Sequence, residues 1–122
     1  MRVLVVDGAN VIGSRPDGWW RDRGAAAQRL HRSIAAAELD SDLVVLVLEG
    51  AAKHGQPAGD EGSLRTVHAP GAGDDEIVEQ VSASVSNRDD VVVVTADRVL
   101  RQRVAEAGGS CVGPSWLLAR TS

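Results

Sequence analysis

The sequence predicts an α/β fold in which a largely parallel β-sheet is covered by helices on both faces. Short apolar runs alternate with segments of helical periodicity, in the order βα, β, βα, βα, βα. Two of the runs, residues 42–49 (DLVVLVLE) and 91–94 (VVVV), are almost continuously apolar, which is typical of parallel strands buried on both faces. With 122 residues and no internal repeat, the chain is expected to form a single domain over residues 1–122.

The first strand is expected at residues 2–6 (RVLVV), a β-branched, apolar run without a turn residue. It leads directly into Asp7, and Gly8 is expected to let the backbone turn sharply after it. Residues 8–24 contain several glycines, a proline, two adjacent tryptophans and three arginines, and are expected to form a long functional loop. Residues 25–39 then show the apolar spacing of a helix.

The rest of the chain continues the alternation. After the strand at 42–49, residues 50–62 are polar and glycine-rich, and are expected to be a mobile connection. The remaining elements are expected to be a strand at 64–68, a helix at 74–86, a strand at 91–94, a helix at 97–107, a strand at 110–112 and a helical turn at 114–119. Sheets of this kind bind ligands beyond the carboxyl ends of their strands, so a functional site is expected there.

The composition excludes several classes of protein. A net charge of −4 argues against a domain that binds nucleic acid through bulk positive charge, but it is compatible with an acidic pocket that holds cations. No apolar run is long enough to span a membrane, and Met1 leads straight into the first strand, so neither a membrane span nor a signal peptide is expected. Cys111 is the single cysteine, so no internal disulfide is possible and a reducing cytoplasm is the expected location.

Acidic residues follow the predicted strands. They are Asp7, Glu49, Asp74 and Asp97. Because parallel strands bring their carboxyl ends to one edge, we expect these carboxylates to lie close together, where mutual repulsion would raise their pKa values. A hard divalent cation, Mg²⁺ or Mn²⁺, would relieve that repulsion. Histidines and cysteines at zinc-binding spacing are absent, and His68 is the one histidine near the acidic stretch.

Each of these acids also has a structural interpretation. Asp74 and Asp97 are suitable N-caps for the helices that they precede, and Glu49 before Gly50 is compatible with a solvated turn. Asp7 directly ends a buried strand and favours a functional role. Helical spacing places Asp74 on the apolar face of its helix, whereas Asp75 falls on the solvated face and becomes a candidate for contact with substrate.

Four motifs carry a resemblance to a known family. VDGANVI, VLEG, AGDDEIVEQ and VVVVTADRVLRQRV, in this order and spacing, resemble the PIN-like nucleases, and within them the NYN-domain, YacP-like branch of small bacterial ribonucleases. The likeness covers nearly the whole chain. It implies a three-layer α/β/α sandwich with a mainly parallel sheet of order 3-2-1-4-5. It also implies metal-dependent hydrolysis of phosphodiester bonds in RNA.

The resemblance carries over to particular residues. The positions that match the catalytic motifs are Asp7, Asn10, Asp74, Thr95 and Asp97. It implies that Asn10 orients Asp7 or contacts substrate, and that Thr95 holds a metal-bound water. Mg²⁺ or Mn²⁺ would be bound by Asp7, Asp74 and Asp97, with Glu49 bound directly or through water. Many relatives carry Asp at the position of Glu49, so its longer side chain makes it the least secure ligand.

The phosphates of an RNA require further partners. Basic candidates near the same edge are Arg15, Arg21, Arg23, Lys53, Arg98 and Arg101, each of which could instead be an ordinary solvated charge. Trp19 and Trp20 lie side by side in a polar loop, where both cannot easily be buried. One of them is expected to stack on a base, and packing over the sheet edge is the alternative. Trp116 is expected in the core.

The strand-end acids also have two interpretations other than a nuclease. The acids are also compatible with structural caps in a domain that binds RNA or a protein without cleaving it. A phosphatase of the haloacid dehalogenase type also begins with an aspartate at a strand end, but it needs a second aspartate two residues later, where this chain has Ala9. We therefore expect a metal-dependent endoribonuclease acting on single-stranded RNA, with no membrane partner, and homodimer formation is left open.

Overall fold

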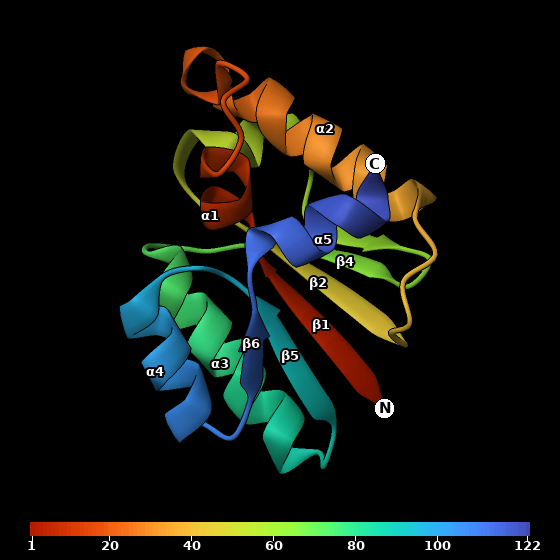
Figure 1. The fold of residues 1–122 in the computed structure, drawn as a ribbon, viewed down its shortest axis with the longest axis vertical. Helices are drawn as coiled ribbons and strands as arrows, with labels where there is room; N and C mark the ends of the chain where they lie inside the picture. The colour runs from red at the N-terminus through yellow and green to blue at the C-terminus, as the bar shows by residue number, and fades with distance from the viewer.

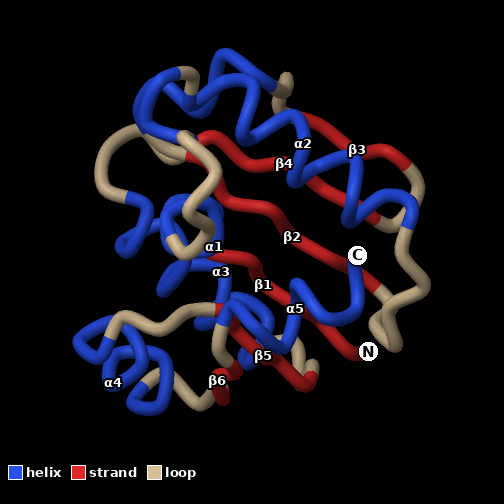
Figure 2. The backbone as a smooth tube through the Cα atoms, turned by 45° about the horizontal axis from the view of Figure 1, so that its top comes forward, coloured by secondary structure: helices blue, strands red, loops and turns tan.

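The computed structural model describes residues 1–122, in which one six-stranded sheet has the order β3-β4-β2-β1-β5-β6. The strands are β1 (Arg2–Asp7), β2 (Leu43–Leu48), β3 (Gly59–Glu61), β4 (Leu64–His68), β5 (Asp90–Val94) and β6 (Ser110–Val112). Figure 2 shows β1 in the middle of the sheet, between β2 and β5. All neighbouring strands run parallel except β3, which pairs antiparallel with β4.

Helices cover both faces of this sheet. One face carries α1 (Gly8–Gly13), α2 (Arg23–Ala36) and α5 (Pro114–Thr121), and the other carries α3 (Gly73–Ser86) and α4 (Arg98–Glu106). Figure 1 shows α2 and α5 together on one side of the sheet and α3 and α4 on the other. Side chains alternate along β1, so that Leu4 and Val6 enter the first core cluster and Val3 and Val5 the second. The predicted three-layer sandwich is therefore confirmed.

The predicted order of the five parallel strands is also confirmed, but the sheet has one strand more. Residues 50–62 were expected to be a connection, and instead they form a 3-10 helix, η2 (Gly50–Gly55), and the edge strand β3. The sequence of β3, GDE, contains no alternation of apolar and polar residues that would indicate a strand, and all three residues are exposed. It is held by a tight turn at Gly62, whose φ is 60°, and by the pair Asp60–Arg65 across the hairpin.

The expected loop at residues 8–24 is largely helical. Asp7 is followed at once by α1, and a 3-10 helix, η1 (Trp19–Arg21), precedes α2. The chain turns from β1 into α1 at Gly8, as expected, but without a positive φ at this residue. A Cβ at Gly8 would lie 2.6 Å from the carbonyl oxygen of Val47, so glycine is required because α1 packs closely on β2.

A second close approach joins α2 to η2. A Cβ built on Gly55 would overlap the carbonyl oxygen of Gly24, so the two backbones touch without an intervening side chain. None of the helices combines the length and the apolar character that crossing a membrane requires.

Candidate active site

Asp7 lies at the carboxyl end of the central strand and is only 5% exposed. One carboxylate oxygen accepts a hydrogen bond from the backbone N–H of Asn10 at 3.2 Å, and the other accepts from the hydroxyl of Thr95 at 2.9 Å. The bond from Asn10 makes Asp7 the N-cap of α1. The sequence suggested capping for Asp74 and Asp97 only, so this structural role of Asp7 is an addition.

Thr95 links the ends of two strands. Its side chain is fully buried, and its hydroxyl donates to Asp7 while accepting from the backbone N–H of Asp97 at 3.2 Å. Asp97 in turn accepts from the N–H of Leu100 at 3.0 Å, so it caps α4 as the sequence suggested. The side chain of Asn10 accepts from the N–H of Ala96 at 2.8 Å, which fastens α1 to the turn between β5 and α4.

Glu49 and Asp74 lie on the other side of the same edge. Glu49 is half-buried and accepts from the backbone N–H of Gly73 at 3.1 Å, so it holds the first residue of α3. The solvated-turn interpretation of Glu49 is therefore wrong. A Cβ at Gly73 would lie 2.9 Å from the Glu49 carboxylate, which explains the glycine before the acidic pair. Asp74 lies inside the first turn, is half-buried and accepts no hydrogen bond, so it is not the cap of α3.

The carboxylates at this edge affect one another. Burial raises the pKa of Asp7, the hydrogen bonds from Thr95 and Asn10 lower it in part, and the charges of Asp74 and Glu49 raise it again. Burial also raises the pKa of Asp74, followed by repulsion from Asp97 and Glu49, with Arg103 acting in the opposite direction. We call Asp7, Glu49, Asp74 and Asp97 the acidic edge.

The acidic edge has the oxygen ligands that Mg²⁺ and Mn²⁺ prefer, and the crowding of its charges suits a cation. It is not a preformed metal-binding site, since no three Asp, Glu, His or Cys side chains are arranged to hold a metal ion. Asp7, Glu49 and Asp97 each use an oxygen to hold a backbone N–H. The chemistry of the ligand set therefore fits the metal, and binding would require side chains to turn.

Several candidate contacts have protein partners instead. Asp75 is exposed and pairs with Arg103 of α4 at 3.0 Å, outside the acidic edge. The ammonium group of Lys53 donates to the carbonyl oxygen of Ala69 at 3.1 Å and ties η2 to the end of β4. His68 makes a 2.7 Å hydrogen bond with the carbonyl oxygen of Gln56 and is not part of the acidic edge.

Three other candidate cations form no ion pair with an acidic side chain. Arg101 donates through Nε to the carbonyl oxygen of Thr95 at 2.9 Å, while its side chain remains exposed at the start of α4. Arg98 and Arg15 are exposed and have no acidic partner. Arg103 was not among the residues that the sequence indicated. It is the third arginine of α4, after Arg98 and Arg101, and the one that pairs with α3.

The two tryptophans have different environments. Trp20 is 56% exposed, whereas Trp19 is half-buried and packs against the core beneath α1 and α2. The rings meet edge to face with their centroids 5.9 Å apart. The guanidinium of Arg21 lies over Trp20 and that of Arg23 over Trp19, at 5.8 and 5.4 Å from the ring centroids. As expected, the two rings are not both buried. Stacking of one of them on a base stays a prediction. Trp116 is half-buried on the same core.

The three layers and the mainly parallel sheet with β1 at its centre form an α/β sandwich that is consistent with the PIN-like fold. Within this class the chain has the YacP-like fold. It matches the crystal structure of Rae1 (YacP) from Bacillus subtilis with a TM-score of 0.74 and 20% sequence identity, over 99% of this chain and 74% of that one. The W164L mutant of the same protein matches with a TM-score of 0.73 and 18% identity, over 99% and 75%.

The resemblance inferred from the four motifs is thus confirmed at the level of the fold. No protein-family model matches the sequence, and no curated protein does either.

Proposed function

We propose that this protein is a metal-dependent endoribonuclease that hydrolyses phosphodiester bonds in single-stranded RNA. The observation that supports this most strongly is Asp7, a carboxylate buried at the end of the central strand whose pKa is raised by burial and by two neighbouring acids. The YacP-like fold is compatible with such an activity. A cytoplasmic location fits the lone cysteine.

The carboxylates of Asp7, Asp74 and Asp97 would hold Mg²⁺ or Mn²⁺, with Glu49 bound directly or through water. A bound metal of this kind lowers the pKa of its water and polarises the phosphate. Thr95 keeps the Asp7 carboxylate in one orientation by donating to it at 2.9 Å. Asp74 accepts no hydrogen bond from the protein, and its pKa is raised by burial and by repulsion from Asp97 and Glu49, so its carboxylate is available to a cation.

Positive charge beside the acidic edge would hold the RNA backbone. Arg98 and Arg101 lie on the first turn of α4, directly after Asp97, and Arg23 lies beside Glu49 at the start of α2. Guanidinium groups bind phosphate oxygens without sequence preference, so these arginines would contribute affinity and not specificity.

A second candidate function is RNA binding without cleavage. It is favoured by one specific observation, namely that Asp7, Glu49 and Asp97 all hold backbone N–H groups at the starts of helices. A domain that used its acids only in this way would need no metal.

Cleavage assays separate the two functions. Purified protein is expected to cut single-stranded RNA with Mg²⁺ or Mn²⁺ and to stop when a chelator is added. Asp74→Asn should lower the rate by about 100-fold or more, because it removes a metal-binding carboxylate without removing a structural hydrogen bond. Glu79→Gln, which removes an exposed charge from the same helix, is the matched control and should cut as the parent does. Equal activity of the Asp74→Asn variant and the parent would refute the proposed site.

A further inference from the structure

A cleft of about 270 Å³ opens beside the acidic edge, between α1, η1, the start of α2 and η2. Its walls include the Trp19 ring, the Arg23 side chain and the Glu49 carboxylate, with small or apolar residues completing it, among them Ala9, Ile12 and Ala52. The volume lies just below the roughly 300 Å³ at which pockets for drug-sized ligands begin, so the cleft suits a single flat ring system.

The walls of this cleft have the chemistry that recognises a nucleobase. Trp19 presents an indole ring, and the guanidinium of Arg23 lies 5.4 Å from the ring centroid, so two planar groups border the same space. Bases in single-stranded nucleic acids stack on aromatic rings and on arginine side chains of this kind. Glu49 borders the cleft and also repels Asp7 and Asp74, so an occupant of the cleft would lie next to the acidic edge.

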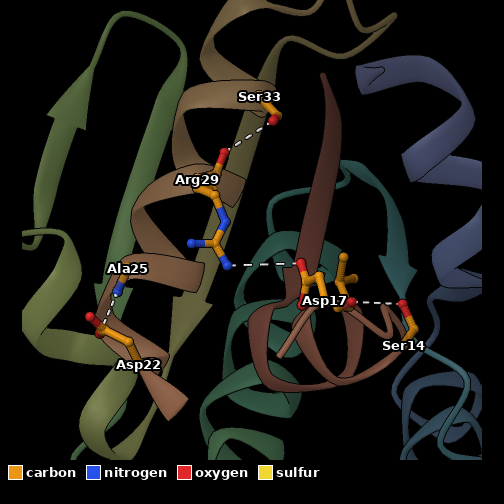
Figure 3. Close-up of polar contacts among 7 residues, drawn as sticks. Ser14, Asp17, Asp22, Ala25, Arg29 and Ser33 are labelled. Atoms are coloured by element: carbon orange, nitrogen blue, oxygen red, sulfur yellow. Dashed lines mark hydrogen bonds and ion pairs between the residues drawn. The ribbon is translucent and has the colours of Figure 1, made fainter. Parts of the chain in front are cut away.

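The cleft is held in shape by contacts within the segment that carries Trp19. Figure 3 shows that the Ser14 hydroxyl donates to a carbonyl of α1, at 2.6 Å, and that Asp17 pairs with Arg29 of α2 at 3.8 Å. Asp22 caps α2 by accepting from the N–H of Ala25 at 2.9 Å, and the contact of α2 with η2 fixes the opposite wall. A ligand that enters would therefore have little of the protein to order.

We propose that this cleft binds one nucleobase of the RNA, the base next to the phosphate at the acidic edge, stacked against the Trp19–Arg23 pair that lines the cleft. The inference rests on the proposed function for the identity of its ligand. Trp20 does not line the cleft, so the two tryptophans differ in their contribution to binding. Since every base has a flat face, binding in the cleft depends on the presence of a base and only weakly on which base it is.

The test measures binding without cleavage. A short single-stranded oligoribonucleotide is titrated into the full chain by calorimetry, in chelator, and compared with a series in which one nucleotide in turn is abasic. One abasic position is expected to weaken binding by about 5- to 150-fold, which corresponds to the loss of one stacked base. Trp19→Leu should cause a similar loss and abolish the effect of the abasic position, while Trp19→Phe should restore much of the affinity.

Matched variants separate the cleft from the rest of the loop. Trp20→Leu and Arg21→Gln are expected to weaken binding less than Trp19→Leu and Arg23→Gln, because the first pair lies outside the cleft. Circular dichroism checks that Trp19→Leu is folded. If Trp19→Leu does not fold, Trp19→Phe is compared with the parent in its place. Equal losses in both pairs, or no abasic position that weakens binding, would overturn the inference. If RNA is still cleaved in that case, only the base-binding proposal fails and the nuclease proposal is retained. If binding depends on the base but no RNA is cleaved, only the nuclease proposal fails.

Discussion

The two halves of the acidic edge differ in how firmly their carboxylates are held. At the ends of β1 and β5, Asp7, Thr95 and Asp97 form a continuous chain of hydrogen bonds that also caps two helices. Beside β2 and α3, Glu49 accepts one hydrogen bond and Asp74 accepts none. Substitutions in the first half therefore combine structural and electrostatic effects. A substitution of Asp74 removes no hydrogen bond, so its effect on stability measures the repulsion between the carboxylates.

The largest effect on stability is expected when the Thr95 hydroxyl is removed. The first half of the acidic edge would then be held as loosely as the second. Thr95→Val keeps the shape but removes the hydrogen-bond partner of one Asp7 carboxylate oxygen and of the Asp97 N–H. We expect a loss of about 1–3 kcal/mol in the free energy of unfolding, measured with urea. Thr66→Val is the control, since the buried Thr66 hydroxyl has no partner and its removal should be neutral or stabilising. Equal losses in both variants would mean that the Thr95 hydrogen bonds contribute nothing.

Metal binding is expected to act on both halves at once. A cation bound only by the folded protein stabilises it by RT ln(1 + [L]/Kd), which is about 1.4 kcal/mol at ten times Kd. Mn²⁺ should therefore raise the melting temperature of the parent, and it should raise that of Asp74→Asn less. Calorimetric scans with and without Mn²⁺, with Glu79→Gln as the control, check this. A shift with Mn²⁺ that is the same in all three proteins would place any bound ion away from the acidic edge.

Without metal, neutralising one acid should stabilise the less constrained half only. Asp74→Asn removes a charge that repels Asp97 and Glu49, and we expect a gain on the order of 1 kcal/mol. Asp7→Asn removes a repelling charge as well, but its amide can no longer accept from both Thr95 and Asn10. The urea midpoint in chelator should therefore rise in Asp74→Asn and rise less, or fall, in Asp7→Asn. The reverse order would show that the hydrogen bonds of Asp7 matter less than its charge.

The smallest effect is expected in the dependence of stability on pH. The pKa values of Asp7 and Asp74 are raised above their ordinary 3.8, so both groups bind protons more tightly in the folded state. Their contribution to stability is complete below the unfolded pKa and is lost as the pH rises through the folded pKa. In chelator, stability should fall less steeply over that range in Asp74→Asn than in the parent. Parallel curves for the two proteins would contradict the raised pKa.

The elements that the sequence predicted correctly are those with a strong local signal. The strands at residues 2–6 and 91–94 are continuous apolar runs, and the helices around residues 25–39 and 74–86 have a clear apolar face. The missed elements have no such signal. The helix α1 is only six residues long, and β3 contains no apolar residue, so neither shows a period. They form because α1 packs on β2 and because β3 pairs with β4.

The acids of the site could be located from the sequence, but their hydrogen bonds could not. Parallel strands place Asp7 and Asp97 at one edge whatever the details of the loops. The capping role of Asp7 depends on α1, and the hydrogen bond of Glu49 depends on a glycine 24 residues later, so both required the tertiary structure. The catalytic and metal-binding roles of these residues stay predictions.

The contact between Gly24 and Gly55 has a consequence for the sequences that this fold accepts. At position 55 an added Cβ would overlap a backbone carbonyl, which cannot be moved aside as a flexible side chain can. At position 24 the nearest atom to an added Cβ is the backbone nitrogen of Gly55, at 3.3 Å, so alanine needs only a small displacement. In a library of all single substitutions selected for folded protein, position 55 should accept glycine alone, whereas position 24 should also accept alanine.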